Sequence, residues 1–212
     1  MLDTVLGWMR AGRVFGFWLA TPCVTTSRVR GLTYGPPRLR STEHYRGLPD
    51  LPPDQRELAD KANLLIDNAA RILRLAAALG IPGGEENPRT SMLWLFPSRE
   101  RLLARWADVI VDYCSCGLSV RKRTRFLMIH VGEPDSSPFT CRLSRGLCSF
   151  SGKRHLHILG ARNGRWLSKE FEPYPPKIAA FVGDLIRHTV DRNVVARLSS
   201  LSRASLPTMI GC

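Results

Sequence analysis

The sequence predicts an α/β fold: an open sheet that ends in an antiparallel hairpin, with flanking helices and an irregular loop that carries cysteines and histidines. The apolar segment 14–20 has the length and composition of a buried strand. Residues 54–79 carry apolar side chains at helical spacing. Residues 108–113 and 125–131 are apolar segments joined by a basic connection, which is typical of a hairpin.

The helices are predicted from their apolar periodicity and their end signals. Residues 1–9 form a short helix that Gly12 ends. For the long helix 54–79 we expect Asp54 as the N-cap and Gly80 as the stop. Its expected buried stripe is Leu58, Ala62, Leu65, Ala69, Ile72, Ala76 and Leu79.

The segments between these helices and strands are shorter or irregular. Residues 30–53 are rich in Gly, Pro and Arg, and they predict a long loop outside the core. We expect a short strand at 85–87 and a helix that Ser98 caps and that ends at about Ala107. Residues 155–159 are expected to form one more strand.

The C-terminal part predicts a last helix that the prolines 175–176 open, followed by a polar tail at 199–212. The chain is therefore expected to form one domain, 1–190, with a Cys/His-containing insert at 133–157, and a helix end and tail at 191–212. The residues of the last helix that we expect to face inward are Ile178, Val182, Leu185, Ile186, Thr189 and Val190.

The charge balance of the 212 residues favours a polyanionic partner. The net charge is +13, and 26 of the 31 basic residues are Arg. The planar guanidinium suits phosphate groups and guanine edges, so nucleic acid, most simply DNA, is the expected partner. The alternative is that the Arg content reflects a GC-rich genome.

Membrane association and secretion are not expected. No stretch of the chain reaches the roughly 20 apolar residues that a membrane span needs. The apolar segment 14–20 is too short for a signal peptide with a plausible cleavage site. The cysteines do not resemble a secreted disulfide framework. We therefore expect an intracellular protein, and a nuclear one if the source is eukaryotic.

Two segments at predicted strand ends carry a nucleophile and an acid. Thr21-Pro22-Cys23 ends the first strand, and Glu86-Asn87-Pro88 follows the long helix. Open α/β sheets place their chemistry at this edge. A thiolate can add to carbon 6 of a pyrimidine ring while a carboxyl group holds or protonates nitrogen 3, which makes carbon 5 nucleophilic. The alternatives are that Cys23 is a small buried apolar residue and that Glu86 pairs with an arginine.

Four segments, in order along the chain, resemble motifs of the cytosine-5 DNA methyltransferases. Residues 21–27 resemble the strand-end Pro-Pro-Cys motif, with Thr21 in place of the first proline. Residues 86–88 resemble Glu-Asn-Val, and 116–125 resemble the turn with Gln-Arg-x-Arg that leads into a strand. Pro-Pro at 175–176 resembles the start of the helix that helps to close the methyl-donor pocket in that family.

This resemblance implies a partial Rossmann-like methyltransferase sheet and a role for each matching residue. Cys23 would attack a flipped cytosine, Glu86 would hold nitrogen 3, and the methyl group would come from S-adenosylmethionine. The implied substrate contacts are Ser27, Arg28, Asn87, Arg121, Arg123 and Arg125, and the implied donor contacts are Pro22 and Pro176. The alternative for Arg121, Arg123 and Arg125 is that they form part of a basic hairpin exposed to solvent.

The resemblance covers only the catalytic half of the family's fold. The family's Gly-rich turn for S-adenosylmethionine has no counterpart before Cys23, and the large target-recognition domain has none either. We therefore expect a missing N-terminal half or a partner to supply the donor site. Alone, the chain is expected to resemble a methyltransferase more in descent than in activity.

The spacing of cysteines and histidines predicts a second site. Six residues separate Cys141 from Cys148, and six more separate Cys148 from His155. With Cys114 as a fourth ligand, these residues predict a structural zinc site. Cys116 and His157 are alternative ligands, and free thiols are the other explanation. The second functional hypothesis is accordingly a non-catalytic, basic, zinc-stabilised nucleic-acid-binding module.

Overall fold

A four-stranded open sheet forms the centre of the computed structural model, which describes residues 1–32, 35–157, 160–162 and 165–204. The strands are β1 (Phe17–Ala20), β2 (Gly83–Pro88), β3 (Ala107–Asp112) and β4 (Arg123–Ile129). Their spatial order is β1-β2-β4-β3. β1 is parallel to β2, and β4 runs antiparallel to both β2 and β3. The predicted α/β class with a terminal antiparallel hairpin is therefore confirmed at this level.

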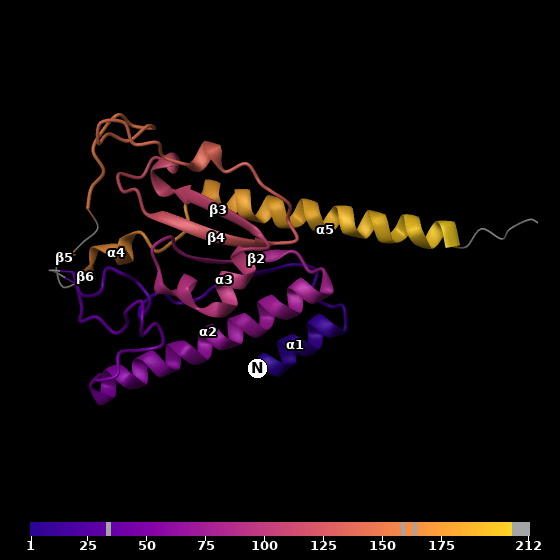
Figure 1. Cartoon of the computed structure of the whole chain (residues 1–212). Helices are drawn as coiled ribbons and strands as arrows, with labels where there is room; N and C mark the ends of the chain where they lie inside the picture. Colours follow the sequence, from indigo (N-terminus) through magenta and orange to yellow (C-terminus); the bar gives the residue numbers. More distant parts are fainter. Residues whose placement is uncertain (33–34, 158–159, 163–164, 205–212) are drawn as a thin grey trace, which may run out of the picture.

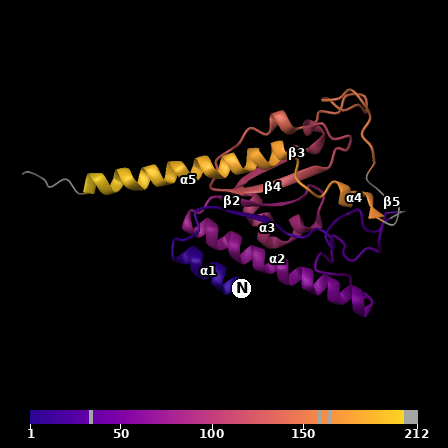
Figure 2. The same ribbon diagram turned by 180° about the vertical axis from the view of Figure 1, so that it is seen from behind.

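Helices cover both faces of the sheet (Figures 1 and 2). The helices α1, α2 and α3 lie on one side, and α5 lies across the other and extends beyond the sheet. The helix bounds are α1 Leu2–Arg10, α2 Pro53–Leu79, α3 Pro97–Leu103, α4 Leu167–Glu170 and α5 Pro176–Ala204. Three 3-10 turns, η1 Met92–Leu95, η2 Tyr113–Cys116 and η3 Ser137–Phe139, and a small strand pair, β5 Ala161–Arg162 and β6 Arg165–Trp166, complete the described elements.

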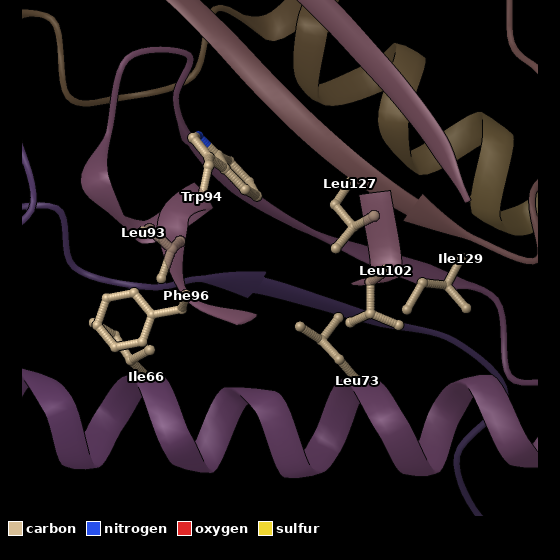
Figure 3. Packing of buried hydrophobic residues seen from close by; sticks show 8 residues of the cluster. All are labelled: Ile66, Leu73, Leu93, Trp94, Phe96, Leu102, Leu127 and Ile129. Carbon is tan, nitrogen blue, oxygen red and sulfur yellow. The ribbon is translucent and has the colours of Figure 1, made fainter. Parts of the chain in front are cut away.

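Alternation along β4 divides the core into two layers. Leu127 and Ile129 pack towards α2 and α3, in one cluster with Ile66 beneath Phe96 and Leu73 beneath Leu102 (Figure 3). Phe126 belongs to the other layer, under α5. This is the two-residue period of a strand that is buried on both faces.

The central strand β2 is almost free of apolar side chains because its neighbours leave no room for them. A Cβ on Gly84 would lie 2.5 Å from the Leu127 carbonyl oxygen and 2.9 Å from the Trp18 ring. Only glycine fits so close an approach. The sequence therefore predicts only the end of this strand, at 85–87, whereas the strand begins at Gly83.

The buried face of α2 is displaced from the predicted stripe, so this prediction was wrong in part. Leu58, Leu65 and Leu79 are 40%, 48% and 40% exposed. The residues that are buried are Ala59, Asn63, Ile66, Ala69, Ala70, Leu73 and Ala76. The α2 residues that face the segment 30–53 are small, apart from the amide Asn63. They leave space beside the helix that a polar side chain of that segment occupies.

That side chain is Arg40, and it corrects the expectation that the loop 30–53 lies outside the core. Arg40 is 1% exposed. Its guanidinium donates to the Thr25 carbonyl and hydroxyl oxygens, to Asn63 Oδ1 at 2.8 Å and to two further carbonyl oxygens. Burial lowers the pKa of Arg40 to about 10. The loop is thus fastened to α2 by hydrogen bonds, in addition to the packing of Tyr45 against the core cluster that contains Ile66 and Leu73.

Several predicted ends also differ from the structure. The N-caps of α2 and α3 are Pro52 and Phe96, not Asp54 and Ser98, since a proline occupies the first position of each helix. The helix α5 continues to Ala204, so the first part of the predicted tail is helical. The predicted strand 155–159 is irregular up to 157, and its last two residues lie outside the described residues, as do 205–212. In the part of the chain that the structure describes, no helix has the length and apolarity of a membrane span.

Candidate active site and metal cluster

The parallel pairing of β1 with β2 brings Cys23 and Glu86 to the same edge of the sheet. Ala20 is opposite Glu86 in the register, and Cys23 follows three residues later. The Asn87 amide donates to the Thr21 carbonyl oxygen at 2.7 Å, which ties the two strand ends together. A tight turn follows, in which the backbone N–H of Ser27 donates to the Cys23 carbonyl oxygen at 2.8 Å. The sequence-predicted nucleophile and acid therefore lie next to each other.

The adjacent Glu85 and Glu86 point to opposite faces of β2 and have different partners. Glu85 is fully buried and accepts two hydrogen bonds from the Arg99 guanidinium, at 2.8 and 2.9 Å. It also accepts one from the Thr21 hydroxyl at 2.5 Å. This buried pair joins β2 to α3 and to the end of β1, so it holds the backbone that carries Cys23. Sequence reasoning did not single out either residue, although two successive acids in a strand indicate opposite roles.

The Glu86 carboxyl lies on the α5 side, among polar groups that sequence reasoning also missed. Burial raises the pKa of Glu86, while Lys122 and a hydrogen bond with Tyr174 oppose the rise. Burial also raises the pKa of Cys23; Glu86 adds to this rise and Lys122 opposes it. The Tyr174 hydroxyl is itself fixed by the Trp18 indole N–H, which donates to it at 3.4 Å. A thiol, a carboxyl group and an ammonium thus lie near one another at this edge of the sheet.

Replacing Glu86 with glutamine should stabilise the chain at high pH. The folded state holds the Glu86 proton more tightly than the unfolded state, so its contribution to stability is full at low pH and is lost as pH rises through the raised pKa. We expect the melting temperatures of Glu86→Gln and wild type to coincide near about pH 4 and to diverge in favour of the variant near about pH 8. Glu57→Gln is the control, because Lys61 lowers the pKa of the exposed Glu57 and no gain at high pH is expected. A difference in melting temperature between Glu86→Gln and wild type that is the same at both pH values would contradict a raised pKa of Glu86.

The three arginines that the resemblance assigned to the substrate are paired with carboxylates of β3. Arg121 and Arg123 both contact the buried Asp112, at 3.2 and 3.0 Å. Arg125 contacts Asp108 at 3.0 Å and lies over the Trp94 ring. Their role towards a substrate stays a prediction, and each of these side chains is only partly exposed.

Ser27 and Arg28 line a cavity of about 320 Å³ beside the Cys23 turn. Arg30 and Arg38 contribute two more guanidiniums, and Ser41 contributes a hydroxyl. Arg30 is held in place by the Pro37 carbonyl oxygen, 2.9 Å from its Nε. Guanidiniums with hydroxyls are donors that suit phosphate oxygens. The loop after the thiol can therefore bind the backbone of a nucleic acid.

The described residues do not fit S-adenosylmethionine. The residues ahead of β1 form the helix α1, whose Leu6 and Met9 pack against Ala76 and Ile81. Within 1–16, as far as the structure describes it, no strand leads through a Gly-rich turn into a helix. Pro176 opens α5 as the sequence predicts. A proline at a helix start does not by itself make a donor site.

The metal cluster assembles as the spacing predicts. Four ligand atoms lie within 4.8 Å of one another: those of Cys114, in the turn η2 that follows β3, and of Cys141, Cys148 and His155. The Cys141 Sγ lies 3.8 Å from the Cys148 Sγ and 3.9 Å from the His155 Nε2. Two thiolates that bind one tetrahedral zinc at about 2.3 Å are about 3.8 Å apart. The cluster can therefore hold a metal ion of this kind.

Hydrogen bonds around the cluster favour a thiolate at Cys148 and connect the cluster to the sheet, whereas burial and the neighbouring thiols raise the pKa of Cys114. Burial alone would raise the pKa of Cys148, but hydrogen bonds from Ser151 and from the Phe150 backbone lower it to about 6. The Cys141 N–H donates to Asp112 at 2.8 Å, and Arg121 donates to the Cys141 carbonyl oxygen at 2.9 Å. The alternative ligands lie elsewhere: Cys116 packs in the layer under α5, and His157 is exposed.

Comparison with known proteins gives no relative: no family model, no curated protein and no solved structure matches the chain.

Proposed function

We propose that this chain carries the base-attacking half of a cytosine-5 methyltransferase-type site, acting on cytosine in nucleic acid, most simply DNA. One observation carries the proposal: the Cys23 thiol and the Glu86 carboxyl lie near each other at the ends of the parallel strands β1 and β2. The antiparallel strand β4 beside β2 supports it, because the resemblance implied such a strand. The net charge of +13 and the guanidinium-lined cavity favour a polyanionic substrate.

The chemistry follows from the two side chains. The Cys23 thiol gives its proton to solvent, and the thiolate forms a bond to carbon 6 of the cytosine ring. The Glu86 carboxyl group, whose pKa is raised by burial, gives a proton to nitrogen 3, which accepts the ring's extra electron pair. Carbon 5 becomes nucleophilic and takes a proton from water. Water removes the original carbon 5 proton, the thiolate leaves carbon 6, and nitrogen 3 returns its proton to the Glu86 carboxylate, which restores both the ring and the carboxyl group.

Methyl transfer needs a donor that the described residues do not fit. S-adenosylmethionine would supply an electrophilic methyl group to carbon 5, and we propose that a missing N-terminal half or a partner protein binds it. No step of the mechanism above passes through that donor. The addition and its reversal involve only the described side chains of this chain.

Hydrogen exchange at carbon 5 tests this proposal without a methyl donor. We expect the chain in heavy water to introduce one deuterium into cytosine of single-stranded DNA, which needs no base flipping. Cys23→Ser should slow the exchange on the order of 10³-fold or more, and Glu86→Gln about 10²–10⁴-fold. The control is Cys116→Ser, a half-buried thiol outside both sites, which should keep the wild-type rate. Wild-type exchange no faster than that of Cys23→Ser would refute the proposal.

A second function is favoured by the Cys/His cluster: a zinc-stabilised nucleic-acid-binding module without catalysis. The ligand atoms of Cys114, Cys141, Cys148 and His155 support a zinc ion that fastens the loop 133–157 to the end of β3. A salt-dependent DNA-binding assay separates the two functions. Equal affinity of wild type and Cys23→Ala, with exchange by neither, would favour the module over the enzyme.

A further inference from the structure

Lys122 differs from the other cations of the basic segment 121–125. The arginines on either side pair with carboxylates of β3, on the face of the hairpin where β3 carries its acids. Lys122 falls on the other face because side chains alternate along a strand. This is the face of Phe126, whose register partner is Glu86. Lys122 therefore lies on the same face of the sheet as Glu86, at the edge where Cys23 lies.

The Lys122 ammonium is held in place by neutral acceptors. Its Nζ donates to the Phe171 carbonyl oxygen at 2.7 Å, to the Tyr113 hydroxyl at 3.2 Å and to the Glu172 carbonyl oxygen at 3.4 Å. It also lies 4.5 Å from the centre of the Tyr113 ring. Three donors thus have three acceptors, so the position of the charge is fixed before any substrate arrives.

This charge is not neutralised by an ion pair. In the part of the chain that the structure describes, no carboxylate forms a salt bridge with Lys122. Burial lowers the pKa of Lys122, and its electrostatic partners Glu86 and Cys23 oppose this shift by favouring the charged form. The other titratable groups that face these side chains are Tyr113 from η2 and Glu172 and Tyr174 from the segment between α4 and α5.

We propose that Lys122 is a positioning residue that places a fixed positive charge beside Cys23 and so stabilises the thiolate. The proposal deepens the proposed function and rests on it for the identity of the substrate, but its effect on the thiol does not need a substrate. When the thiol proton leaves for solvent, the ammonium keeps its own protons and balances the new negative charge. The thiolate then forms its bond to carbon 6, and Glu86 supplies the proton for nitrogen 3.

The test measures the alkylation of Cys23 by iodoacetamide, resolved by peptide mass spectrometry, from about pH 6 to about pH 10. Lys122→Gln should slow alkylation about tenfold at a fixed pH below the thiol's pKa and move the pH profile upward, because a cation at short range favours the anion. Lys122→Met keeps the apolar stem on the Tyr113 ring and should give the same result. Lys122→Arg keeps the charge and should stay closer to wild type.

Lys177→Gln is the matched control, because it removes the same charge from an exposed position at the start of α5. It should leave the alkylation profile of Cys23 within about twofold of wild type. Folded Lys122→Gln and Lys122→Met variants with unchanged profiles would overturn the proposal, even if wild-type exchange at carbon 5 is found. A shifted profile together with no exchange would support Lys122 and count against the proposed function alone.

Discussion

Replacing Arg99 with methionine is expected to lower the free energy of unfolding by about 3–5 kcal/mol, because it leaves the Glu85 carboxylate buried without its partner. Both side chains are 0% exposed, and two parallel hydrogen bonds join them. For a chain of this size the melting temperature should fall by about 10 °C. Thermal unfolding followed by circular dichroism measures the change.

Two further variants distinguish an unpaired charge from lost packing. Arg187→Met removes an exposed pair with Asp184, whose side chains are 65% and 55% exposed, and should cost no more than about 1 kcal/mol. The double variant Glu85→Leu/Arg99→Met removes both charges and should recover most of the loss. If the double variant is no more stable than Arg99→Met, the buried charge is not the cause.

Removal of zinc should have the second large effect. At a free metal concentration of about 1,000 times the dissociation constant, a bound ion stabilises the folded chain by about 4.1 kcal/mol. That corresponds to a fall of about 8–16 °C in melting temperature on metal removal. Metal analysis of the purified chain should find about one zinc per chain. Cys148→Ser should lose the metal and melt at the temperature of the zinc-free wild type.

The effect of zinc removal should reach the candidate active site at Cys23. Cys114 belongs to the same 3-10 turn as Tyr113, which contacts Lys122, and the Tyr113 N–H donates to the Arg121 carbonyl oxygen at 2.9 Å. Iodoacetamide should therefore alkylate Cys23 more slowly in the zinc-free protein. Cys116→Ser, in the same turn but outside the cluster, should keep both metal and stability. A metal content near zero in protein purified without chelator would rule out the site.

Periodicity in the sequence was sufficient to predict the elements whose buried residues are apolar. It was insufficient where the buried residues are polar. It located the long helix, the hairpin and the strand before Cys23, because their apolar residues alternate with the right period. It placed the stripe of α2 wrongly because Asn63 and Arg40 replace apolar contacts there. The start of β2 carried no signal, because Gly83 and Gly84 are required by close backbone approach.

The candidate sites show the same division. Spacing predicts the metal cluster but leaves Cys116 and His157 as alternative ligands, and the fold selects Cys114 and His155. Cys23 and Glu86 follow from strand ends that turn out to be parallel neighbours. Lys122 and Arg99 could not be found in this way, since one arginine or lysine among many carries no mark of its partner. Only the strand register, with the alternation of side chains along the strand, places Lys122 beside Glu86 and Cys23 and places Arg121 and Arg123 beside Asp112.

The most direct measurement of the central claim is the mass of the peptide that contains Cys23 after incubation with DNA carrying 5-azacytosine. The ring nitrogen at position 5 makes carbon 6 more electrophilic, so the thiolate adduct should accumulate. We expect one covalent adduct per chain on Cys23, strongly reduced in Lys122→Gln and absent in Cys23→Ser. A chain that binds this DNA but forms no adduct on Cys23 would contradict the account.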